Sequence, residues 1–322
     1  MTPVVSILMA VYNAEVWLQA ALDSVVQQTM GEWELLAVDD ASADGSLAIL
    51  QEYAQRDNRI RVFHHDENKG LAHARNTALH QVRGEFVMML DADDWLSPDA
   101  LQNAIDVFHD HPLTDCVLFR LVYEWQETSN SEDFHMRLPK QSSGKANDIV
   151  LAGTDAFLLS LDWSIHGLYL VRNEVHKDLP FDTDYRLYSD DNTSRVVFLR
   201  CREVRLCQGI YHYRRHQASV TMQFSSQRFL HMMANLDLRE TLKKEGVSED
   251  IVARYDKHRW HNYLGLLWLY FRHRSDMNKE ECARVRVDFR YVYTSFHRSM
   301  PYAFFVANQW VRYKIKSFIK RL

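Results

Sequence analysis

Short apolar runs alternate with stretches of helical periodicity over the first third of the chain. Four of the runs have the length of strands: Val4–Met9, Trp33–Val38, Arg61–Phe63 and Phe86–Leu90. After each run, apolar residues recur every three or four positions and predict a helix: Glu15–Gln28, Ser46–Gln55, Leu71–Val82 and Pro98–Asp110. This alternation predicts an α/β fold with a mostly parallel sheet that helices cover on both faces.

The pattern becomes less regular further along the chain. Strands are expected at Cys116–Tyr123, Leu168–Val171, Val204–Leu206 and Ile210–Arg214, and helices at Leu151–Leu161 and Asn192–Arg200. The polar stretch Glu124–Lys145 predicts a surface loop. Beyond about residue 225 only helical spacing remains, at Phe229–Lys244, Ile251–Phe271 and Tyr302–Lys320. We therefore predict one domain over residues 1–221 and a helical region over residues 222–322.

Three carboxylates follow the fourth apolar run within four positions, in the order Asp91-Ala92-Asp93-Asp94. Carboxylates this close repel one another unless a positive group lies among them. Mn²⁺ or Mg²⁺ would fit, because these cations prefer oxygen ligands and often bind one or two carboxylates together with substrate phosphates. Open α/β sheets also bind ligands at the carboxyl ends of their strands. The alternative is a polar turn before a helix, with Ser97 as its N-cap and Pro98 as its first residue.

Two other strand ends carry candidate ligand contacts. Asp40 ends the second strand, where an acid often accepts a hydrogen bond from a ribose hydroxyl or a base N–H. Ala10 and Tyr12 follow the first strand, and a small residue near an aromatic one suits a stacked nucleobase. A helix cap at Asp40 and a plain turn after the first strand are the alternatives.

Later segments add a basic residue and two acids. Arg75 lies near the start of the third helix, where the N-terminus favours anions, so it is a candidate for binding a phosphate oxygen. A surface ion pair is the alternative for Arg75. The adjacent acids Asp190 and Asp191 precede another helix, and one of them can cap it while the other serves as a general base.

Donor groups crowd the segment that follows the last expected strand. Arg214, Arg215 and Ser219 are candidates for closing over a diphosphate. His216 belongs to the same group and can instead bind the metal through a neutral imidazole.

The composition is that of a soluble globular protein, with 47% apolar residues, 25% charged residues and a net charge of −5 over 322 residues. No apolar run reaches the roughly 18 residues of a membrane span, and no secretory signal is recognisable. The four cysteines form no CxxC pair, so we expect reduced thiols in a cytoplasmic protein. Neither G-x-G-x-x-G after the first strand nor G-x-x-x-x-G-K-[ST] occurs, which argues against a dinucleotide cofactor and a P-loop ATPase.

The end of the chain is basic and aromatic. Residues 289–322 contain seven Lys and Arg and no acid, and residues 301–322 mix these with Phe, Trp and Tyr. A basic segment suits nucleic acid or an anionic membrane surface, and an aromatic basic helix can lie in a membrane interface. The alternative is a terminal helix packed on the protein with a solvated basic face.

Taken in order, these segments resemble the family 2 glycosyltransferases, which have a nucleotide-diphospho-sugar-binding GT-A fold. The first matching stretches are Val5–Asn13, Gln28-Thr29 with Trp33–Leu35, Val38–Ser46, Asn68–Asn76 and Gly84–Trp95. The later ones are Asp190-Asp191 and Tyr213–Thr221, so the resemblance covers roughly residues 3–221. It implies a GT-A type catalytic domain over residues 1–221.

The resemblance implies an inverting, metal-dependent transferase of hexosyl or N-acetylhexosaminyl groups. Such an enzyme moves a sugar from a nucleoside diphosphate, here expected to be UDP, to a hydroxyl of a glycan or lipid-linked glycan in polysaccharide synthesis. A peripheral contact of residues 301–322 with the inner face of the cytoplasmic membrane would suit such an acceptor, whereas nucleic acid would not be a partner. The helical region can also pair subunits, so a homo-oligomer is an open expectation.

The resemblance also assigns roles to the candidate residues. The nucleotide would lie on Ala10, Tyr12, Asp40, Arg75, Asp91 and Ala92, with Asp40 holding the base and Arg75 near the diphosphate or sugar. The cation, Mn²⁺ or Mg²⁺, would be bound by Asp93 with help from Asp91 or Asp94, and His216 is a further candidate. Asp191, or alternatively Asp190, would deprotonate the acceptor.

Two other functional classes stay open at this level. A nucleotidyltransferase can share such a sheet, but it would carry glycine and lysine in the first loop, and residues 10–15 have neither. A non-catalytic module that binds a nucleotide-sugar or glycan on the same fold is the other alternative, although it would not require Asp91, Asp93 and Asp191 together.

Overall fold

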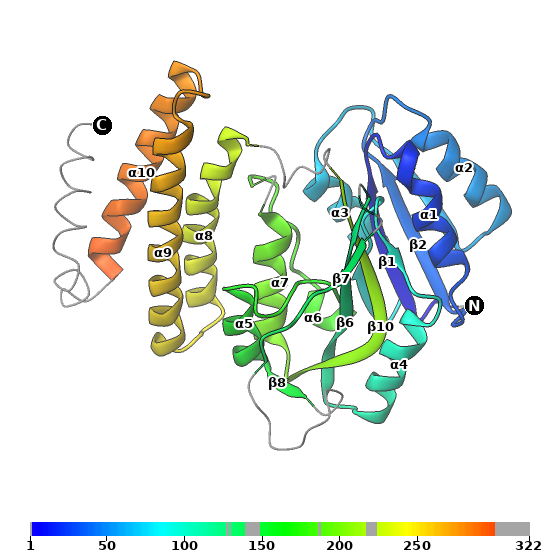
Figure 1. Ribbon diagram of the computed structural model, residues 1–322. Coiled ribbons are helices and arrows are strands. Elements are labelled where there is room, and N and C mark those ends of the chain that lie inside the picture. The colour runs from blue at the N-terminus through cyan, green and yellow to red at the C-terminus, as the bar shows by residue number, and fades with distance from the viewer. Residues whose placement is uncertain are drawn as a thin grey trace. The chain divides into compact units, whose positions relative to one another are not determined.

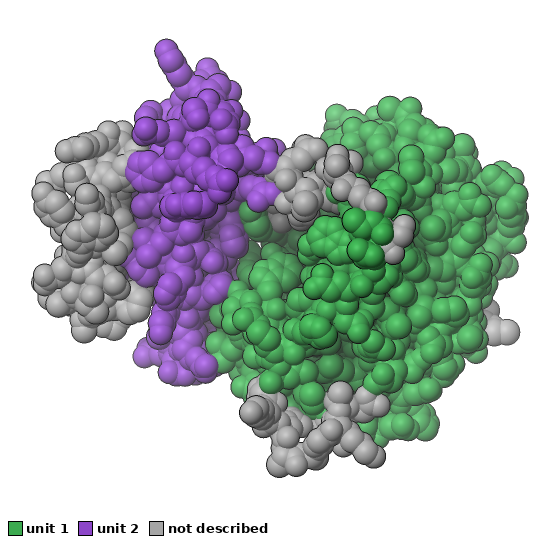
Figure 2. Space-filling model, viewed as in Figure 1, with its two compact units in different colours: residues 1–222 green, residues 223–322 purple. Residues whose placement is uncertain are grey.

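The computed structural model describes residues 2–126, 128, 130–138, 149–185, 188–216 and 224–299 (Figure 1). It divides into two compact units, Met1–Met222 and Gln223–Leu322 (Figure 2). Ser219, the basic tail 301–322 and the helix expected at Tyr302–Lys320 lie outside the described residues, as does part of the expected polar loop.

The first half of the sheet is parallel, as predicted. Strands β1 (Val5–Val11), β2 (Trp33–Asp39), β3 (Ile60–His64) and β4 (Phe86–Met89) pair in the order β3-β2-β1-β4. All seven residues of β2 are buried, because helices cover both faces of the sheet. The helices are α1 (Glu15–Val26), α2 (Ser46–Arg56), α3 (Leu71–Leu79) and α4 (Ala100–Asp110).

Two apolar clusters lie on the two faces of the sheet. Side chains of α1, α2 and α4 pack with Val5, Ile7 and Met9 of β1, whereas those of α3 pack with Leu8. Alternate residues of a strand point to opposite faces, so α3 covers the face opposite α1, α2 and α4. The predicted α/β architecture is confirmed, with the candidate strand ends of β1, β2 and β4 at one edge.

The second half of the sheet is mixed. Strand β9 (Tyr169–Arg172) lies between β4 and β6 (Thr114–Trp125) and runs antiparallel to both. Strand β10 (Glu203–Arg215) is parallel to β6 and also pairs with β5 (Trp95–Leu96). The other elements are β7 (Asn130–Asp133), β8 (Val150–Ala152), α5 (Gly153–Ser160), α6 (Asn173–His176) and α7 (Ser189–Arg200).

Three local predictions differ from the structure. The strands expected at Val204–Leu206 and Ile210–Arg214 are one strand, β10, whose register shifts between Leu206 and Ile210. The polar loop includes the exposed strand β7, which pairs with β6. Ser97 does not cap α4, because hydrogen bonds to both backbone polar groups of Ile210 hold it at the end of β5, and Asp99 precedes the helix instead.

Among the residues that the structure describes, the second unit contains the 3₁₀ helix η3 (Ser226–Leu230) and three α-helices, α8 (His231–Lys244), α9 (Glu249–His273) and α10 (Lys279–Ser299). Helix α10 was not expected from the sequence, although Val285, Phe289, Val292 and Phe296 bury one face of it. Arg286, Asp288 and Arg290 lie between these positions and concealed the pattern. None of the helices that the structure describes is long and apolar enough to cross a membrane.

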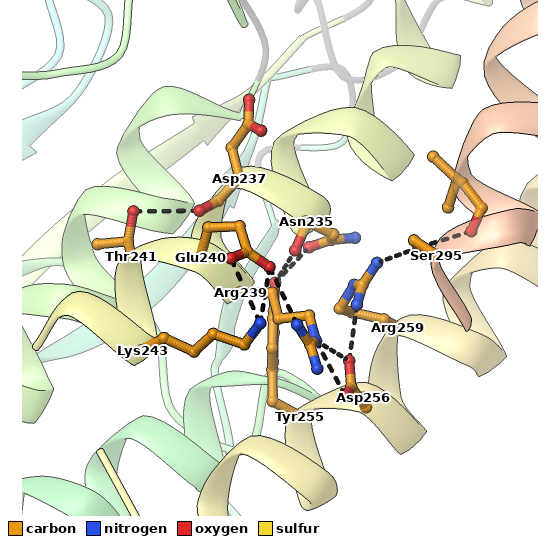
Figure 3. A network of polar contacts seen from close by, with 11 residues as sticks. Asn235, Asp237, Arg239, Glu240, Thr241, Lys243, Tyr255, Asp256, Arg259 and Ser295 are labelled. Carbon is orange, nitrogen blue, oxygen red and sulfur yellow. Dashed lines mark hydrogen bonds and ion pairs between the residues drawn. The ribbon is translucent and has the colours of Figure 1, made fainter. Parts of the chain in front are cut away.

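A buried polar network joins the three helices (Figure 3). Arg239 of α8 donates Nε–H to Asp256 of α9 at 2.8 Å, and Arg259 donates to the same carboxylate oxygen at 2.6 Å. Arg259 also donates to Ser295 Oγ of α10 at 3.2 Å. Asp256 and Arg259 are each 2% exposed, so this charge cluster lies in the interior of the helical unit.

Candidate active site

The candidate residues meet at the edge formed by the carboxyl ends of β1, β2 and β4. Asp91 follows β4, Arg75 lies in α3, and Asp190 lies in the first turn of α7. The Arg75 Nη2–H donates to Asp91 Oδ1 at 2.7 Å, and Nη1 lies 3.4 Å from Asp190 Oδ2. One buried guanidinium therefore links two acids that are 99 residues apart in the sequence.

In this arrangement Arg75 does not have its guanidinium free for the expected contact with a phosphate. The side chain of Arg75 is 4% exposed, and its terminal nitrogens are engaged by the two carboxylates. Burial raises the pKa of Asp91, the Arg75 charge opposes this effect, and the Asp93 carboxylate adds to it. Arg75 thus keeps the charge of Asp91 tolerable at the edge of the sheet.

Asp94 is held inside the protein. Tyr211 of β10 donates its hydroxyl to Asp94 Oδ2 at 2.9 Å, and the Arg214 backbone N–H donates to Oδ1 at 2.8 Å. Tyr211 also accepts a hydrogen bond from the Asp91 N–H at 3.2 Å. Burial and the charges of Asp91 and Asp93 raise the pKa of Asp94 well above its usual value. Asp94 therefore ties the acidic turn to β10.

Asp93 faces a different partner, His216. Its Oδ2 lies 3.1 Å from His216 Nε2, and the imidazole stacks on Trp17 of α1 with ring centroids 5.2 Å apart. His216 Nδ1 is buried and has no hydrogen-bond partner among the described residues. Arg214 lies beside this pair, with its guanidinium over the rings of Trp17 and Trp95 and its Nε–H donated to the Asp93 carbonyl.

The four expected metal ligands do not converge on one point. Within the described part of the chain, no group of three or more His, Cys, Asp or Glu side chains is placed to hold a metal ion. Asp91 is turned to Arg75 and Asp94 to Tyr211, which leaves Asp93 and His216 as a pair. Two protein ligands still fit Mn²⁺ or Mg²⁺ bound together with a substrate diphosphate, because such cations often take most of their oxygen ligands from phosphate and water.

Arg215 does not join Arg214. Its guanidinium lies over the rings of Tyr123 and Trp125, at 4.0 and 4.8 Å from their centroids. Adjacent residues of a strand point to opposite faces, so the two arginines cannot close over the same diphosphate while β10 keeps its pairing with β6.

Asp40 anchors a loop in this structure. It is 2% exposed and accepts hydrogen bonds from His65 Nδ1, the Lys69 N–H and the Gly70 N–H at 2.7, 3.0 and 2.7 Å. Burial opposes ionisation of Asp40, but these donors outweigh it and lower the pKa of the carboxyl. Both carboxylate oxygens of Asp40 therefore already accept hydrogen bonds within the protein.

The nucleotide candidates around β1 and β4 divide into exposed and buried residues. Tyr12 is 53% exposed at the end of β1, whereas Ala10 is partly buried against the cluster under α3. Ala92 packs into the opposite cluster and is 7% exposed, so only its backbone can meet a ligand. Asn13 has a φ of 50° and exchanges hydrogen bonds with Ser42 and Ala43, which joins the turns after β1 and β2.

Asp190 and Asp191 occupy different environments at the start of α7. Asp190 faces Arg75, and its side chain is 42% exposed. Asp191 lines a narrow hollow with Ser160, Trp163, Gly167 and residues of α7. Burial and the charge of Asp190 raise the pKa of Asp191 to about 6, against the opposing charge of Arg195. The structure thus separates a carboxylate paired with Arg75 from a second one whose pKa is raised.

Sequence reasoning missed Trp17 and Tyr211. Each is unremarkable in its own segment, and each acquires its partners only when β10 lies beside β5 and the acidic turn. The spacing of Trp17 in α1 indicated only an amphipathic helix. Tyr211 gave no signal beyond the expected strand.

The comparisons with known proteins agree with the family and the fold that the sequence predicts. The family model described as "Glycosyl transferase family 2" matches residues 6–161. The chain belongs to glycosyl transferase family 2 through this segment. That region contains β1 to β4, the acidic turn Asp91–Asp94 and Arg75, whereas Asp190, Asp191 and His216 lie beyond it.

Two related proteins of Bacillus subtilis (strain 168) are named as glycosyltransferases. EpsH is 31% identical over 231 residues, which cover 71% of this chain and 65% of EpsH. EpsJ is 30% identical over 238 residues, which cover 69% of this chain and 64% of EpsJ. The chain therefore spans less than two thirds of the length of these relatives.

Solved structures share the fold at low sequence identity. Residues 1–349 of S. aureus TarS in complex with UDP-GlcNAc match with a TM-score of 0.63 and 19% identity, covering 92% of this chain and 81% of that one. The mannosyltransferase PcManGT from Pyrobaculum calidifontis, in complex with GDP-Man and Mn²⁺, matches with a TM-score of 0.52 and 17% identity, covering 93% and 87%. These structures support the GT-A architecture of the family 2 chain.

Proposed function

We propose that this family 2 chain transfers a glycosyl group from a nucleoside diphosphate sugar to an acceptor hydroxyl with inversion at the anomeric carbon. The observation that carries the proposal is the arrangement at the edge of the sheet, where Arg75 links Asp91 to Asp190. It brings Asp91 at the end of β4 close to Asp190, the chain neighbour of the candidate base Asp191. A nucleotide-binding strand end and a candidate base then face the same ligand.

The donor that we propose is a UDP-sugar. The exposed ring of Tyr12 offers a stacking surface for a flat base at the end of β1. Asp40 holds the Lys69 and Gly70 backbone that borders this region, so we assign it the shaping of the nucleotide pocket rather than a free hydrogen bond to the base. The UDP-GlcNAc bound by TarS supports the choice of donor.

The diphosphate would lie between Asp93, His216 and Arg214. Arg214 is held by stacking on two indoles and by the hydrogen bond of its Nε–H. Its guanidinium is therefore a fixed positive charge that can donate its terminal N–H groups to a phosphate. A divalent cation bound by Asp93 and His216 would supply neutralisation of the charge that develops on the leaving diphosphate. Preorganised positive groups of this kind are worth several kcal/mol, roughly 3–4, in the transition state.

Asp191 is our candidate for the base. It takes the proton of the acceptor hydroxyl while the oxygen forms its bond to the anomeric carbon. The bond from that carbon to the diphosphate oxygen breaks, and its electron pair leaves with the nucleotide. A carboxyl with a pKa of about 6 is ionised at neutral pH and is still a competent base. Asp190 is committed to Arg75 and therefore positions it.

We propose that the acceptor is a glycan or lipid-linked glycan near an anionic membrane surface. The unit from Gln223 to Leu322 contains 19 Lys and Arg against 10 Asp and Glu, a net charge of +9, while residues 1–222 carry −14. Trp268 and Phe271 are 63% and 43% exposed on α9, with Arg272 and Arg274 against their rings. Exposed aromatic residues beside basic ones suit a membrane interface.

The membrane contact is tested by flotation with vesicles of phosphatidylcholine containing 30% phosphatidylglycerol. We expect the full chain to float, and a variant lacking residues 301–322 or carrying Trp268→Ser and Phe271→Ser to float less. Equal flotation of all forms, or flotation of none, would remove the membrane from the proposal.

A donor screen tests the activity itself. The full chain is incubated with UDP-, GDP- and dTDP-sugars and Mn²⁺, and release of the nucleoside diphosphate is measured beside an Asp191→Asn variant. We expect slow release from a UDP-sugar by the parent and a loss of release in the variant, with thermal stabilisation by UDP kept in both. Binding without release from any donor would favour the non-catalytic module. Release of pyrophosphate from a nucleoside triphosphate would favour a nucleotidyltransferase.

A further inference from the structure

An exposed tryptophan lies on the rim of the hollow that contains Asp191. Trp163 belongs to the loop between α5 and β9 and is 54% exposed. Together with Ser160, Ile165 and Gly167 it lines one side of the hollow, and Asp191, Ser194 and Arg195 of α7 line the other. The candidate base and an exposed indole therefore line the same hollow.

The backbone of Trp163 has an unfavourable conformation. Its φ is +59°, in the left-handed region where glycine and asparagine are favoured and a bulky side chain is an outlier. Residues held in this way collect at ligand sites, where the surrounding structure imposes the conformation. A residue that only fills the surface would be better replaced by glycine or asparagine at this position.

Hydrogen bonds on both sides hold the loop. Asp162 Oδ1 accepts from the Ser164 N–H and hydroxyl at 3.1 and 2.6 Å. Arg137 donates its backbone N–H to the Ser164 carbonyl at 3.0 Å and its guanidinium to the Asp162 carbonyl at 2.7 Å. Ile165 is 1% exposed, so the chain enters the interior two residues after Trp163. The indole is therefore a preformed surface on a fixed loop.

The hollow itself is too narrow for a sugar ring. It has room for about one water-sized group, and a Cβ on Gly167 would already lie 2.8 Å from Ser194 Oγ. A hydroxyl fits such a space, and the ring that carries it must then lie outside, against the rim. The apolar C–H face of a pyranose matches the flat face of an indole in size and polarity.

We propose that Trp163 is the platform of an acceptor subsite, on which a pyranose ring of the acceptor stacks while one of its hydroxyls enters the hollow toward Asp191. This inference deepens the proposed function and depends on it only for identifying the bound sugar as the acceptor. The binding of a sugar ring at Trp163 is nevertheless independent of transfer. It selects a carbohydrate acceptor over an amino acid or simple lipid hydroxyl.

The test uses saturation-transfer NMR on the full chain with UDP present. The probes are the methyl glycosides of β-glucose, β-N-acetylglucosamine, β-galactose and α-mannose at millimolar concentration. The variants are Trp163→Asn and, as a matched control, Tyr291→Ala, which removes another exposed aromatic ring. We expect at least one glycoside to bind the parent and Tyr291→Ala, and to bind Trp163→Asn on the order of tenfold more weakly.

Thermal unfolding of the same variants separates a functional indole from a structural one. Trp163→Asn is expected to unfold at a temperature equal to or higher than the parent, because asparagine adopts this φ more readily. Unchanged glycoside binding in Trp163→Asn, binding of none of the four glycosides by the parent, or a clearly lower unfolding temperature would each overturn the inference. If glycosides bind through Trp163 but no nucleotide-sugar is cleaved, the subsite stands and the proposed transfer fails.

Discussion

Arg75 and Asp190 form an ion pair of 3.4 Å between α3 and α7, and the same guanidinium lies 2.7 Å from Asp91 Oδ1. Two helices that belong to different halves of the sheet are thereby joined at the carboxyl end of β4. The pair arranges the candidate site and also contributes to the stability of the fold.

Replacing Arg75 by Met should destabilise the protein by about 3 kcal/mol, because two carboxylates then lose the buried charge between them. Arg75→Lys should recover only part of this loss, since one ammonium cannot reach both acids as the planar guanidinium does. The measurement is urea unfolding. Arg56→Met, at an exposed helical pair with Glu52, is the matched control and should change stability by less than about 0.5 kcal/mol. Equal effects at the two positions would contradict the assignment.

The rate of sugar transfer should fall on acidification with a midpoint near pH 6. Asp191 has a pKa of about 6 and must be ionised to accept a proton, so roughly one tenth of the parental rate should remain at pH 5. Rates are measured by nucleotide release from pH 4.5 to 8.5.

Asp190→Asn is the informative control for this profile. The Asp190 charge raises the pKa of Asp191, so its removal should move the midpoint to lower pH. An unmoved midpoint would show that the Asp190 charge does not set the pKa of the base. An Asp191→Asn variant that keeps the parental rate would transfer the role of base to Asp190.

Asp191→Asn should also stabilise the fold at pH 8 by about 1–3 kcal/mol. The pKa of Asp191 is raised from 3.8 to about 6 in the folded protein, so the native state binds more protons than the unfolded chain between these values. Stability from this group is therefore present at low pH and is lost as the pH rises through 6. Urea titrations at pH 8 and at pH 4 should show the gain at the first and little at the second. A loss of stability at pH 8 would mean that other groups stabilise the ionised Asp191 carboxylate in the folded protein.

Trp17→Ala should raise the Mn²⁺ concentration needed for half-maximal activity by about 10- to 100-fold, as loss of a residue supporting a metal ligand commonly does. The indole stacks on His216 and lies under Arg214, so both lose their support. Trp17→Phe should restore most of the affinity by keeping a ring. Val16→Ala, at a 77% exposed neighbour, should behave like the parent. A fall in rate with an unchanged Mn²⁺ requirement would show that Trp17 does not support binding of the cation.

Asp256→Asn should destabilise the helical unit by about 3–5 kcal/mol. Arg239 and Arg259 both bind this buried carboxylate, and its loss leaves two positive charges close together in the interior. Circular dichroism during thermal unfolding would register the change. Glu240→Gln, at an exposed partner of Arg239, is the control and should have little effect. A variant as stable as the parent would show that the two arginines find other acceptors.

The sequence allowed the fold and the approximate location of the site to be predicted, but not the partners of its side chains. The four β-α units could be read because each signal is local: an apolar run of strand length, then a helical period. The antiparallel insertion of β9 between β4 and β6 could not, because strand order depends on contacts across more than 80 residues. Helix α10 was not predicted, because charged residues separate its buried positions.

The same distinction between local and distant information explains the acidic turn. Three acids after β4 indicated a ligand site, yet each one binds a different partner: Arg75, Tyr211 or His216. Asp91 and Asp94 looked equivalent to Asp93 in the sequence. Only the pairing of β10 with β6 and β5 brings Tyr211 and Arg214 to Asp94 and leaves Asp93 to His216. Carboxylate spacing alone cannot reveal which of three neighbours remains available to a cation.

The position of β9 has a consequence for biosynthesis. Strand β9 pairs with both β4 and β6, yet it is synthesised after them, so the edges of β4 and β6 that it covers stay unpaired until residue 172 has left the ribosome. Until then two apolar strands present open edges, which are templates for association between nascent chains. Fragments that stop before residue 172 should collect in inclusion bodies, and slowing translation there should increase the demand for chaperones.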